Sequence, residues 1–179
     1  MAVTVETHET LTEAARALGQ GGNYLGGGTV LMRGVNAGEV QGRIVRSRDP
    51  ALRGIAATGD GLRVGAGTTM AEILASRDAA FLHPVAAAIG GPQVRAMATV
   101  GGNLFAYGNY GDFAAALLAL GATVTLAGSG GRGISIDDFL RDRDRYATSL
   151  VQSVTVPRPR DQNAQFDAHS PLCLMGNQN

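Results

Sequence analysis

Two glycine-rich segments contain the residues best suited to chemistry. YLGGGTVLM, residues 24–32, has three consecutive glycines before a threonine, and TVGGNL, residues 99–104, has paired glycines flanked by a hydroxyl and an amide. Consecutive backbone N–H groups without Cβ atoms can form a concave nest for phosphate, especially where the nest leads into a helix. For a single glycine run, a tight turn is an equally good interpretation. Two runs in one short chain favour a joint site for the two phosphates of a pyrophosphate.

The common nucleotide motifs do not account for these glycines. A P-loop requires a lysine, and all 15 cationic side chains of the chain are arginines. The G-x-G-x-x-G motif would require glycine at position 31, which is Leu31. The absence of lysine also excludes Schiff-base chemistry. Some other phosphate site is therefore expected.

The remaining reactive side chains form no catalytic or metal-binding set. Cys173 is the only cysteine, so it can form neither an internal disulfide nor a multi-cysteine metal or cluster site. The three histidines, His8, His83 and His169, are far apart in sequence and lack a nucleophile motif, which is typical of structural or surface positions. We therefore predict no catalytic residue and no metal ligand in this chain.

Charge and termini narrow the class of partner and the compartment. The 179-residue chain has a formal net charge of zero, which argues against nucleic acid as a partner. The RDRDR run, residues 141–145, alternates in sign and is interpreted as a solvated face. The N-terminal MAVTVETHET is neither a signal peptide nor a membrane span, so the expected location is the cytoplasm, without membrane contact.

An α/β lobe over residues 1–57 is expected to position the first glycine segment. Thr10 and Glu13 have the spacing of a capping box, and apolar residues recur on one helical face until Gly19. A short strand NYL precedes the glycines, TVLMRG is expected to begin a second helix, and GRIVRS, residues 42–47, alternates as a strand.

A second lobe over residues 58–157 is expected to be α+β with antiparallel connections. The patterns predict a hairpin around 59–61, a helix from Thr69, a helix near 84–89, the second glycine loop at 99–103, a helix from Asp112 to Leu120 and the strand ATVTLAG. GRGISIDDFL and LVQSVTVP supply further strand-like runs. Residues 158–179 are polar without periodicity and are interpreted as a tail, a linker or the remnant of a missing C-terminal domain.

These segments together resemble a known family. YLGGGTVLM, PQVRAMATVGGNL, DFAAALLALGATVTL and LVQSVTVP have the order and approximate spacing of the FAD-binding subunit or domain of the molybdenum hydroxylases, which include xanthine dehydrogenase and aerobic carbon monoxide dehydrogenase. The resemblance covers about residues 1–157. It implies an α+β fold of two lobes of the vanillyl-alcohol-oxidase (PCMH) type, with FAD extended in the cleft between them.

The resemblance also implies which residues bind FAD. The first loop would contact the pyrophosphate through Gly26, Gly27, Gly28, Thr29 and Val30, flanked by Leu25 and Leu31, and the second would contact the phosphates and ribityl chain through Thr99, Gly101, Gly102 and Asn103. Asp112 matches an acidic residue that holds cofactor hydroxyls, whereas its alternative role is the N-cap of the following helix. Leu150 matches a leucine packed near the flavin ring.

The chain departs from the family pattern in three places. Almost all of the usual C-terminal domain is missing, which implies truncation. AYGNYGD, residues 106–112, has Ala106 at a usually polar position, and it adds Tyr107 and Tyr110, which could stack on a ring or pack the mouth of the cleft. Ser149 replaces an acidic residue expected before the last strand.

The function implied by the resemblance is electron transfer. In the family, a molybdopterin large subunit oxidises the substrate, a small subunit with two [2Fe-2S] clusters relays the electrons, and FAD passes them to an acceptor. We expect this chain to be such an FAD subunit, an oxidoreductase component that oxidises no substrate alone, with those two subunits or a second copy of itself as partner. A stand-alone flavin oxidoreductase and a flavin-free scaffold remain alternatives.

Overall fold

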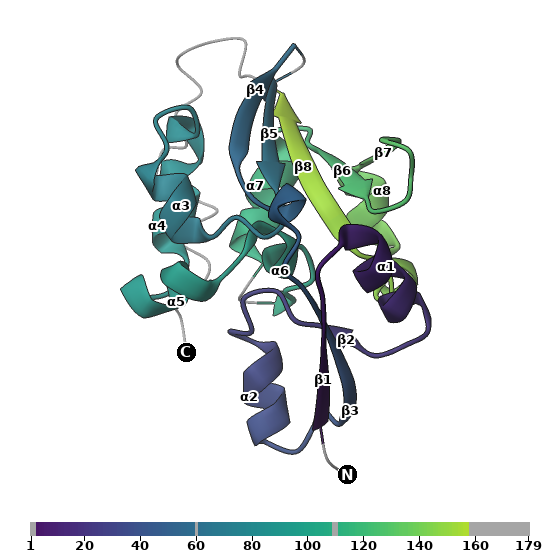
Figure 1. Cartoon of the computed structure of the whole chain (residues 1–179). Coiled ribbons are helices and arrows are strands. Elements are labelled where there is room, and N and C mark those ends of the chain that lie inside the picture. Colours follow the sequence, from purple (N-terminus) through teal and green to yellow (C-terminus); the bar gives the residue numbers. More distant parts are fainter. Residues whose placement is uncertain (1–2, 60, 109–110, 158–179) are drawn as a thin grey trace.

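The protein consists of two sheets with helices around them (Figure 1). The structure, a computed structural model, describes residues 3–59, 61–108 and 111–157. The two sheets lie end to end, and the chain passes from one to the other after β3 (Gly42–Ser47). In the described part of the chain, no helix has the length and apolar character needed to cross a membrane. The two-lobed α+β architecture expected from the sequence is confirmed.

The first sheet is parallel and has the order β1-β3-β2. Its elements are β1 (Val3–His8), α1 (Leu11–Gly19), β2 (Asn23–Tyr24), α2 (Leu31–Asn36) and β3. The predicted cap is present, because the Thr10 hydroxyl accepts a hydrogen bond from the Glu13 N–H. The strand β1 was not predicted, because its isolated alternation VTVETH precedes the first strong helix signal. It pairs with β3 along its whole length.

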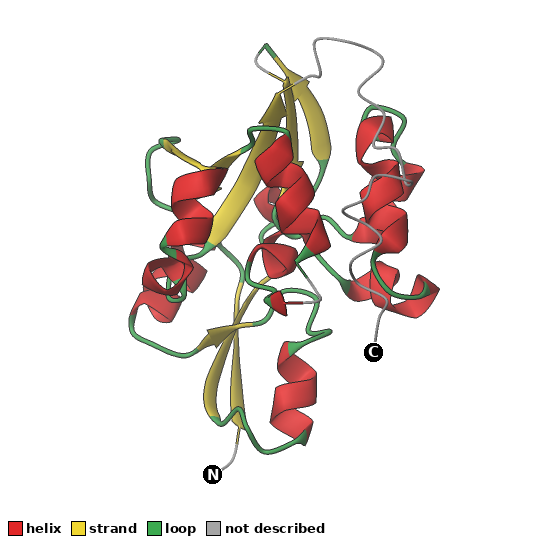
Figure 2. Ribbon diagram, turned by 180° about the vertical axis from the view of Figure 1, so that it is seen from behind, coloured by secondary structure: helices red, strands yellow, loops and turns green. Residues whose placement is uncertain are grey.

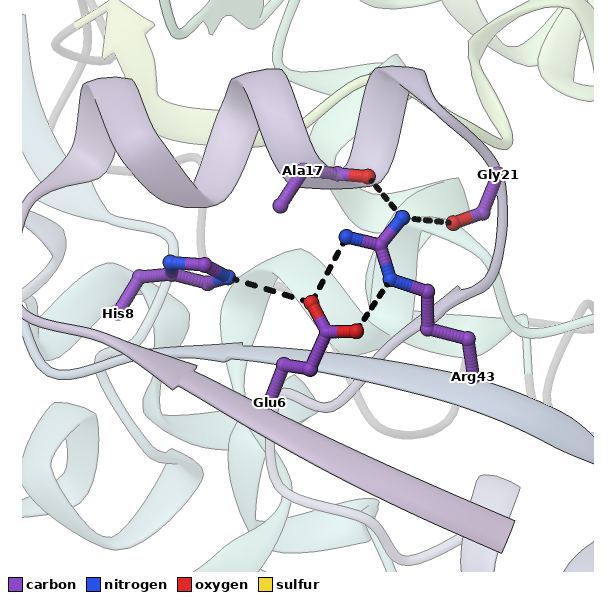
Figure 3. A network of polar contacts seen from close by, with 5 residues as sticks. All are labelled: Glu6, His8, Ala17, Gly21 and Arg43. Carbon is purple, nitrogen blue, oxygen red and sulfur yellow. Dashed lines mark hydrogen bonds and ion pairs between the residues drawn. The ribbon is translucent and has the colours of Figure 1, made fainter.

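One arginine ties this lobe together (Figure 3). The Arg43 guanidinium on β3 donates to both Glu6 carboxylate oxygens on β1, with N–O distances of 2.7 Å. It also donates to the carbonyls of Ala17, at 2.9 Å, and Gly21, at 3.4 Å, at the C-terminal end of α1. This contact holds the pKa of Glu6 below its usual value and raises that of Arg43. The bidentate pair therefore fixes the helix against both strands.

The second sheet is antiparallel and has the order β4-β5-β8-β6-β7. Its strands are β4 (Ile55–Thr58), β5 (Gly61–Gly65), β6 (Thr123–Leu126), β7 (Gly133–Ser135) and β8 (Val151–Pro157). The predicted hairpin joins β4 to β5, with Thr58 opposite Gly61. The division expected after residue 57 lies inside β4, so we propose that the break between lobes lies between Ser47 and Ile55.

Helices cover one face of the second sheet and enclose the larger core (Figure 2). The helices described in this lobe and its connection to the first are η1 (Pro50–Leu52), α3 (Met70–Ala75), η2 (Ala80–Leu82), α4 (His83–Ala88), α5 (Pro92–Met97), α6 (Val100–Leu104), α7 (Asp112–Ala119), α8 (Ile136–Arg141) and η4 (Arg143–Tyr146). Phe113, Leu117 and Phe139 are fully buried among them. Thr69 begins α3 with a complete capping box to Glu72. Hydrogen bonds from Thr69 and Arg53 outweigh partial burial and keep the pKa of Glu72 low.

Two segments fold differently from the sequence prediction. The expected strand GRGISIDDFL forms only the three-residue β7 before α8 begins, because the Ser135 hydroxyl accepts from the Asp138 N–H and caps the helix. The expected second glycine loop is mostly the short helix α6, which Thr99 caps.

Candidate cofactor-binding site

The first glycine segment crosses from β2 to α2 as an open loop. The Leu25 N–H donates to the Val45 carbonyl at 2.8 Å, and Gly28 has a φ of 73°, which favours glycine. Within the described residues, the backbone N–H groups of Gly26, Gly27, Gly28 and Thr29 donate to no group. Four adjacent amides without a partner are an anion-binding arrangement. The turn alternative accounts for the positive φ of Gly28 but leaves these donors unexplained.

Gly27 has a second, steric role. A Cβ on Gly27 would lie 1.7 Å from the Met97 carbonyl oxygen at the end of α5, and a Cβ on Gly26 would lie 2.9 Å from the Thr99 hydroxyl. No side chain could occupy the first position without moving the backbone. The missing Cβ atoms therefore allow the loop of one lobe to touch the other lobe.

The second glycine segment is not a nest, contrary to the sequence prediction. The amides of its four central residues are used: Val100 donates to the Thr68 carbonyl, Gly101 to the Ala66 carbonyl, Gly102 to the Thr99 hydroxyl and Asn103 to the Thr99 carbonyl. Neither glycine has a positive φ. A Cβ on Gly101 would lie 3.0 Å from the Ala66 Cβ, so close packing on the second sheet explains that glycine. This segment supplies a wall of the site, and the amides of both its glycines are already bonded within the second lobe.

Both segments line one cavity of about 790 Å³ between the lobes. This volume is within the range of small-molecule and cofactor sites, which is roughly 300–1,000 Å³. The predicted site residues that line it are Leu25, Gly26, Gly27, Gly28, Thr29, Val30, Leu31, Thr99, Gly101, Gly102, Asn103, Tyr107 and Asp112. Two segments that lie about seventy positions apart in the sequence are thus brought to one cleft.

Leu150 is the predicted site residue that does not line the cavity. Its side chain is 3% exposed and packs with Ala14, Ala17 and Leu18 of α1. The flanking Ser149 and Val151 line the cavity instead. Side chains alternate in direction along an extended segment, so the residue before β8 points to the first lobe.

Asp112 does not cap its helix. Gly111 occupies the N-cap position of α7, no side-chain capping bond is present, and the helical amide of Ala115 bonds the Gly111 carbonyl at 2.9 Å. The cap interpretation of Asp112 is therefore wrong. Its exposed carboxylate stands in the first helical turn at the edge of the cavity and has no hydrogen bond or ion pair within the described residues. It is a spare acceptor facing the ligand space.

The RDRDR run does more than form a solvated face. The Arg143 guanidinium donates to the Ala106 carbonyl and lies 4.5 Å from the centroid of the Tyr107 ring, while the Tyr107 hydroxyl donates to Asp144 at 2.8 Å. The hydrogen bond to Asp144 raises the pKa of Tyr107. Of the two added tyrosines, Tyr107 lines the cavity, and Tyr110 lies outside the described residues.

Four arginines that were not among the predicted site residues also line the cavity. They are Arg33 on α2 and Arg46, Arg48 and Arg53 around the end of β3. Arg48 and Arg53 form ion pairs at 3.6 and 3.1 Å with Glu9 and Glu72, whereas Arg46 has no ion pair or hydrogen bond within the described residues. The sequence signal that could have predicted them is the alternation Arg46-Ser47-Arg48 at the end of an apolar strand, which places both arginines on one side.

Other polar groups at this end of the cavity already have hydrogen-bond partners in the protein or are neutral. The Asp49 carboxylate accepts from the amides of Leu11, at 2.7 Å, and Ala51, at 2.8 Å. Burial raises the pKa of Tyr24, so its phenol is neutral. Within the described part of the chain, no group of three or more potential metal ligands lies close together. The His83 ring forms a hydrogen bond with the Ser76 carbonyl, which is a structural contact.

This donor set fits a flavin dinucleotide. The unpaired amides of the first glycine segment and the cationic Arg46 suit a doubly charged pyrophosphate, and the Thr29 and Thr99 hydroxyls and Asp112 suit polyol hydroxyls. Among the described residues that line the cavity, no pair of groups is arranged for acid–base or nucleophilic catalysis. The arrangement is thus one for binding and orienting.

Comparisons with known proteins agree with this fit. Residues 2–159 match the family described as the FAD binding domain in molybdopterin dehydrogenase. Reconstituted CO dehydrogenase from Oligotropha carboxidovorans is 25% identical, with a TM-score of 0.77 over 89% of this chain and 60% of that chain. A comparison with curated sequences gave no significant match.

Two further solved structures have the same fold. Carbon monoxide dehydrogenase from Hydrogenophaga pseudoflava, in a form that lacks the Mo-pyranopterin moiety, is 26% identical, with a TM-score of 0.77 over 88% of this chain and 59% of that chain. Quinoline 2-oxidoreductase from Pseudomonas putida 86 is 24% identical, with a TM-score of 0.77 over 89% and 60%. The chain thus spans about 60% of the length of the solved chains that it matches.

Proposed function

The chain belongs to the family of FAD-binding domains of molybdopterin dehydrogenases, and from this membership we propose that it carries electrons through FAD between the partner subunits of such an enzyme and an electron acceptor. The bound flavin supplies the redox chemistry. The chain itself binds the dinucleotide, orients it and limits the access of water. The observation that carries the proposal is the run of amides at Gly26–Thr29, which line the cavity and have no hydrogen-bond partner in the part of the chain that the structure describes.

The proposed FAD-binding residues come from both lobes. The amides of the first glycine loop, together with Arg46, hold the pyrophosphate, and Asp112 accepts from hydroxyls of the cofactor. The segment around α6 forms the opposite wall. Among the described residues that line the cavity, no side chain is arranged to abstract a proton from a substrate carbon, and we infer that a partner oxidises the substrate.

The proposed partners are a molybdopterin-containing subunit and an iron–sulfur subunit. Two of the solved relatives are carbon monoxide dehydrogenases, and one of these was solved in a form that lacks the Mo-pyranopterin moiety of its molybdenum cofactor. The described part of this chain contains no group of residues for a metal centre. Electrons would therefore have to come from another chain.

Reconstitution tests the proposal. The chain is loaded with FAD, freed of excess flavin by gel filtration, and assayed for dye reduction with aldehydes, purines or N-heterocycles, alone and after co-expression with molybdopterin and iron–sulfur subunits. We expect bound flavin, no turnover alone and turnover in the complex. Turnover by the isolated chain would support a stand-alone oxidoreductase, and absence of bound flavin would support a scaffold.

A further inference from the structure

Tyr107 is an exposed aromatic side chain that is nevertheless held in place. It is 59% exposed and lines the cavity, at a position where a free side chain would sample several rotamers. Its hydroxyl donates to Asp144 at 2.8 Å, and the Arg143 guanidinium lies 4.5 Å from the ring centroid. These two contacts fix both the tip and one face of the ring.

Arg143 also fixes the backbone beneath the ring. Its Nη1 donates to the Ala106 carbonyl at 2.6 Å, so one guanidinium holds the peptide before Tyr107 and the ring itself. The Arg143 Nε is buried and has no hydrogen-bond partner among the described residues, so placing this side chain here costs solvation free energy. Arg145, two residues later, is exposed and makes no such side-chain contact within the described residues.

We propose that Arg143 and Asp144 hold Tyr107 as a pre-ordered stacking platform for one planar heteroaromatic ring of the bound dinucleotide, an inference that rests on the proposed location of FAD in this cleft. One face of Tyr107 is covered by the cation, which leaves the other face for the ligand. A ring already fixed in the free protein binds without the entropic cost of ordering a side chain. The guanidinium also polarises the phenol ring from behind.

Binding of FAD, FMN and ADP tests this platform. The dissociation constant of each is measured by calorimetry for the parent, Tyr107→Leu, Tyr107→Phe and Arg143→Gln, with Arg145→Gln as the charge-matched control. We expect Tyr107→Leu to weaken FAD about tenfold, from the usual strength of ring stacking. Tyr107→Phe keeps the ring and loses only the Asp144 bond, so its effect should be smaller, and Arg145→Gln should match the parent.

The ligand series identifies the ring that stacks. If it is the isoalloxazine, FMN affinity falls with FAD affinity in Tyr107→Leu, and the fluorescence of bound flavin rises because a quenching neighbour is lost. If it is the adenine, ADP affinity falls and flavin fluorescence stays constant. Either pattern supports the platform.

A double-mutant cycle separates positioning from general stability. Arg143→Gln should weaken FAD binding in the parent and have no further effect in the Tyr107→Leu background, because it acts through the ring. An equal loss in both backgrounds would overturn the inference. So would parental affinity for all three ligands in Tyr107→Leu with unchanged melting temperature. A parent chain that bound no FAD would refute the cleft assignment and this inference together.

Discussion

Glycine has different purposes at Gly27 and Gly102, and alanine substitutions separate them. A Cβ on Gly27 would collide with the Met97 carbonyl, whereas a Cβ on Gly102 would meet only the Thr99 hydroxyl, at 3.1 Å. Gly27→Ala should therefore destabilise the fold by roughly 1–3 kcal/mol through overpacking. Gly102→Ala should leave stability unchanged or raise it by about 0.5–1 kcal/mol, because it lies in a helix.

The two variants differ in how they affect FAD. Gly102→Ala adds a methyl group to the wall and narrows the cavity, so we expect weaker FAD binding at an unchanged or higher melting temperature. Gly27→Ala should lower both quantities. Thermal unfolding and flavin titration of each variant are the measurements. A Gly27→Ala protein as stable as the parent would mean that the loop can move away from α5.

Asp112 should matter for the ligand and little for the fold. Its carboxylate makes no capping bond, so Asp112→Asn should cost only the helix-dipole contribution of about 0.3–1 kcal/mol. If it accepts from cofactor hydroxyls, loss of the charge should weaken FAD binding by on the order of tenfold. Flavin titration at constant pH measures this. Unchanged affinity would remove Asp112 from the site.

Arg46 should bind anion in the cleft. It lines the cavity without an ion pair in the described residues, unlike Arg48 and Arg53, so its charge is available to a pyrophosphate. Arg46→Gln should weaken FAD binding by about tenfold, the usual effect of a lost charge-assisted bond, and make binding less sensitive to salt. Arg132→Gln, which removes an exposed charge from the β6–β7 connection, is the control. Equal losses of FAD affinity in Arg46→Gln and Arg132→Gln would indicate that only the overall charge of the protein matters.

At the scale of elements, the Glu6–Arg43 pair makes the first lobe sensitive to acid. Because Arg43 lowers the pKa of Glu6, the carboxylate contributes stability above its unfolded pKa of about 4.3, and this contribution is lost as pH falls through the lower folded pKa. Glu6→Gln should lower the melting temperature at neutral pH and flatten its decline in acid.

The comparison variant for this prediction is Glu39→Gln. Glu39 is exposed and has no ion pair within the described residues. It should therefore leave the pH profile of the melting temperature unchanged. Identical profiles for the two variants would show that the bidentate pair contributes nothing specific to the lobe.

Elements with a local signal were predictable from sequence. Each of these signals lies in or next to the helix or strand that it predicts. They are the caps at Thr10 and Thr69, the alternation of β3 and the apolar run of α7. The same holds for the antiparallel pairing of β4 with β5. Local chemistry alone therefore located most helices and strands.

The failures depended on distant contacts. Whether Gly101 and Gly102 form a nest or a helix depends on residues that lie between β5 and α3. There, the carbonyls of Ala66 and Thr68 accept hydrogen bonds from the amides of Gly101 and Val100. The direction of Leu150 depends on α1, more than a hundred residues earlier in the chain. Arg46 was missed because an arginine at a strand end is ordinarily solvated, and only the apposition of the lobes gives it a cavity to line.

At the scale of the whole molecule, packing contacts join the two lobes in the described part of the chain. The Gly27 loop touches the end of α5, and Leu150, which precedes a strand of the second sheet, packs against α1 of the first lobe. Tyr24 packs against both hydrophobic clusters. A ligand in the cleft adds contacts to both lobes at once. Bound FAD should therefore act as a further link between them.

The last prediction uses Leu150 to separate this link from the site. Leu150→Ala should cost about 2–5 kcal/mol, as for other buried leucines, and FAD at a hundred times its dissociation constant should recover about 2.7 kcal/mol in variant and parent alike, because Leu150 lies outside the cavity. Leu62→Ala, a buried leucine within the second sheet, is the matched control. Thermal unfolding with and without FAD measures both terms. If FAD recovered much less in Leu150→Ala than in Leu62→Ala, Leu150 would have to contact the cofactor or set the lobe spacing that the cofactor requires.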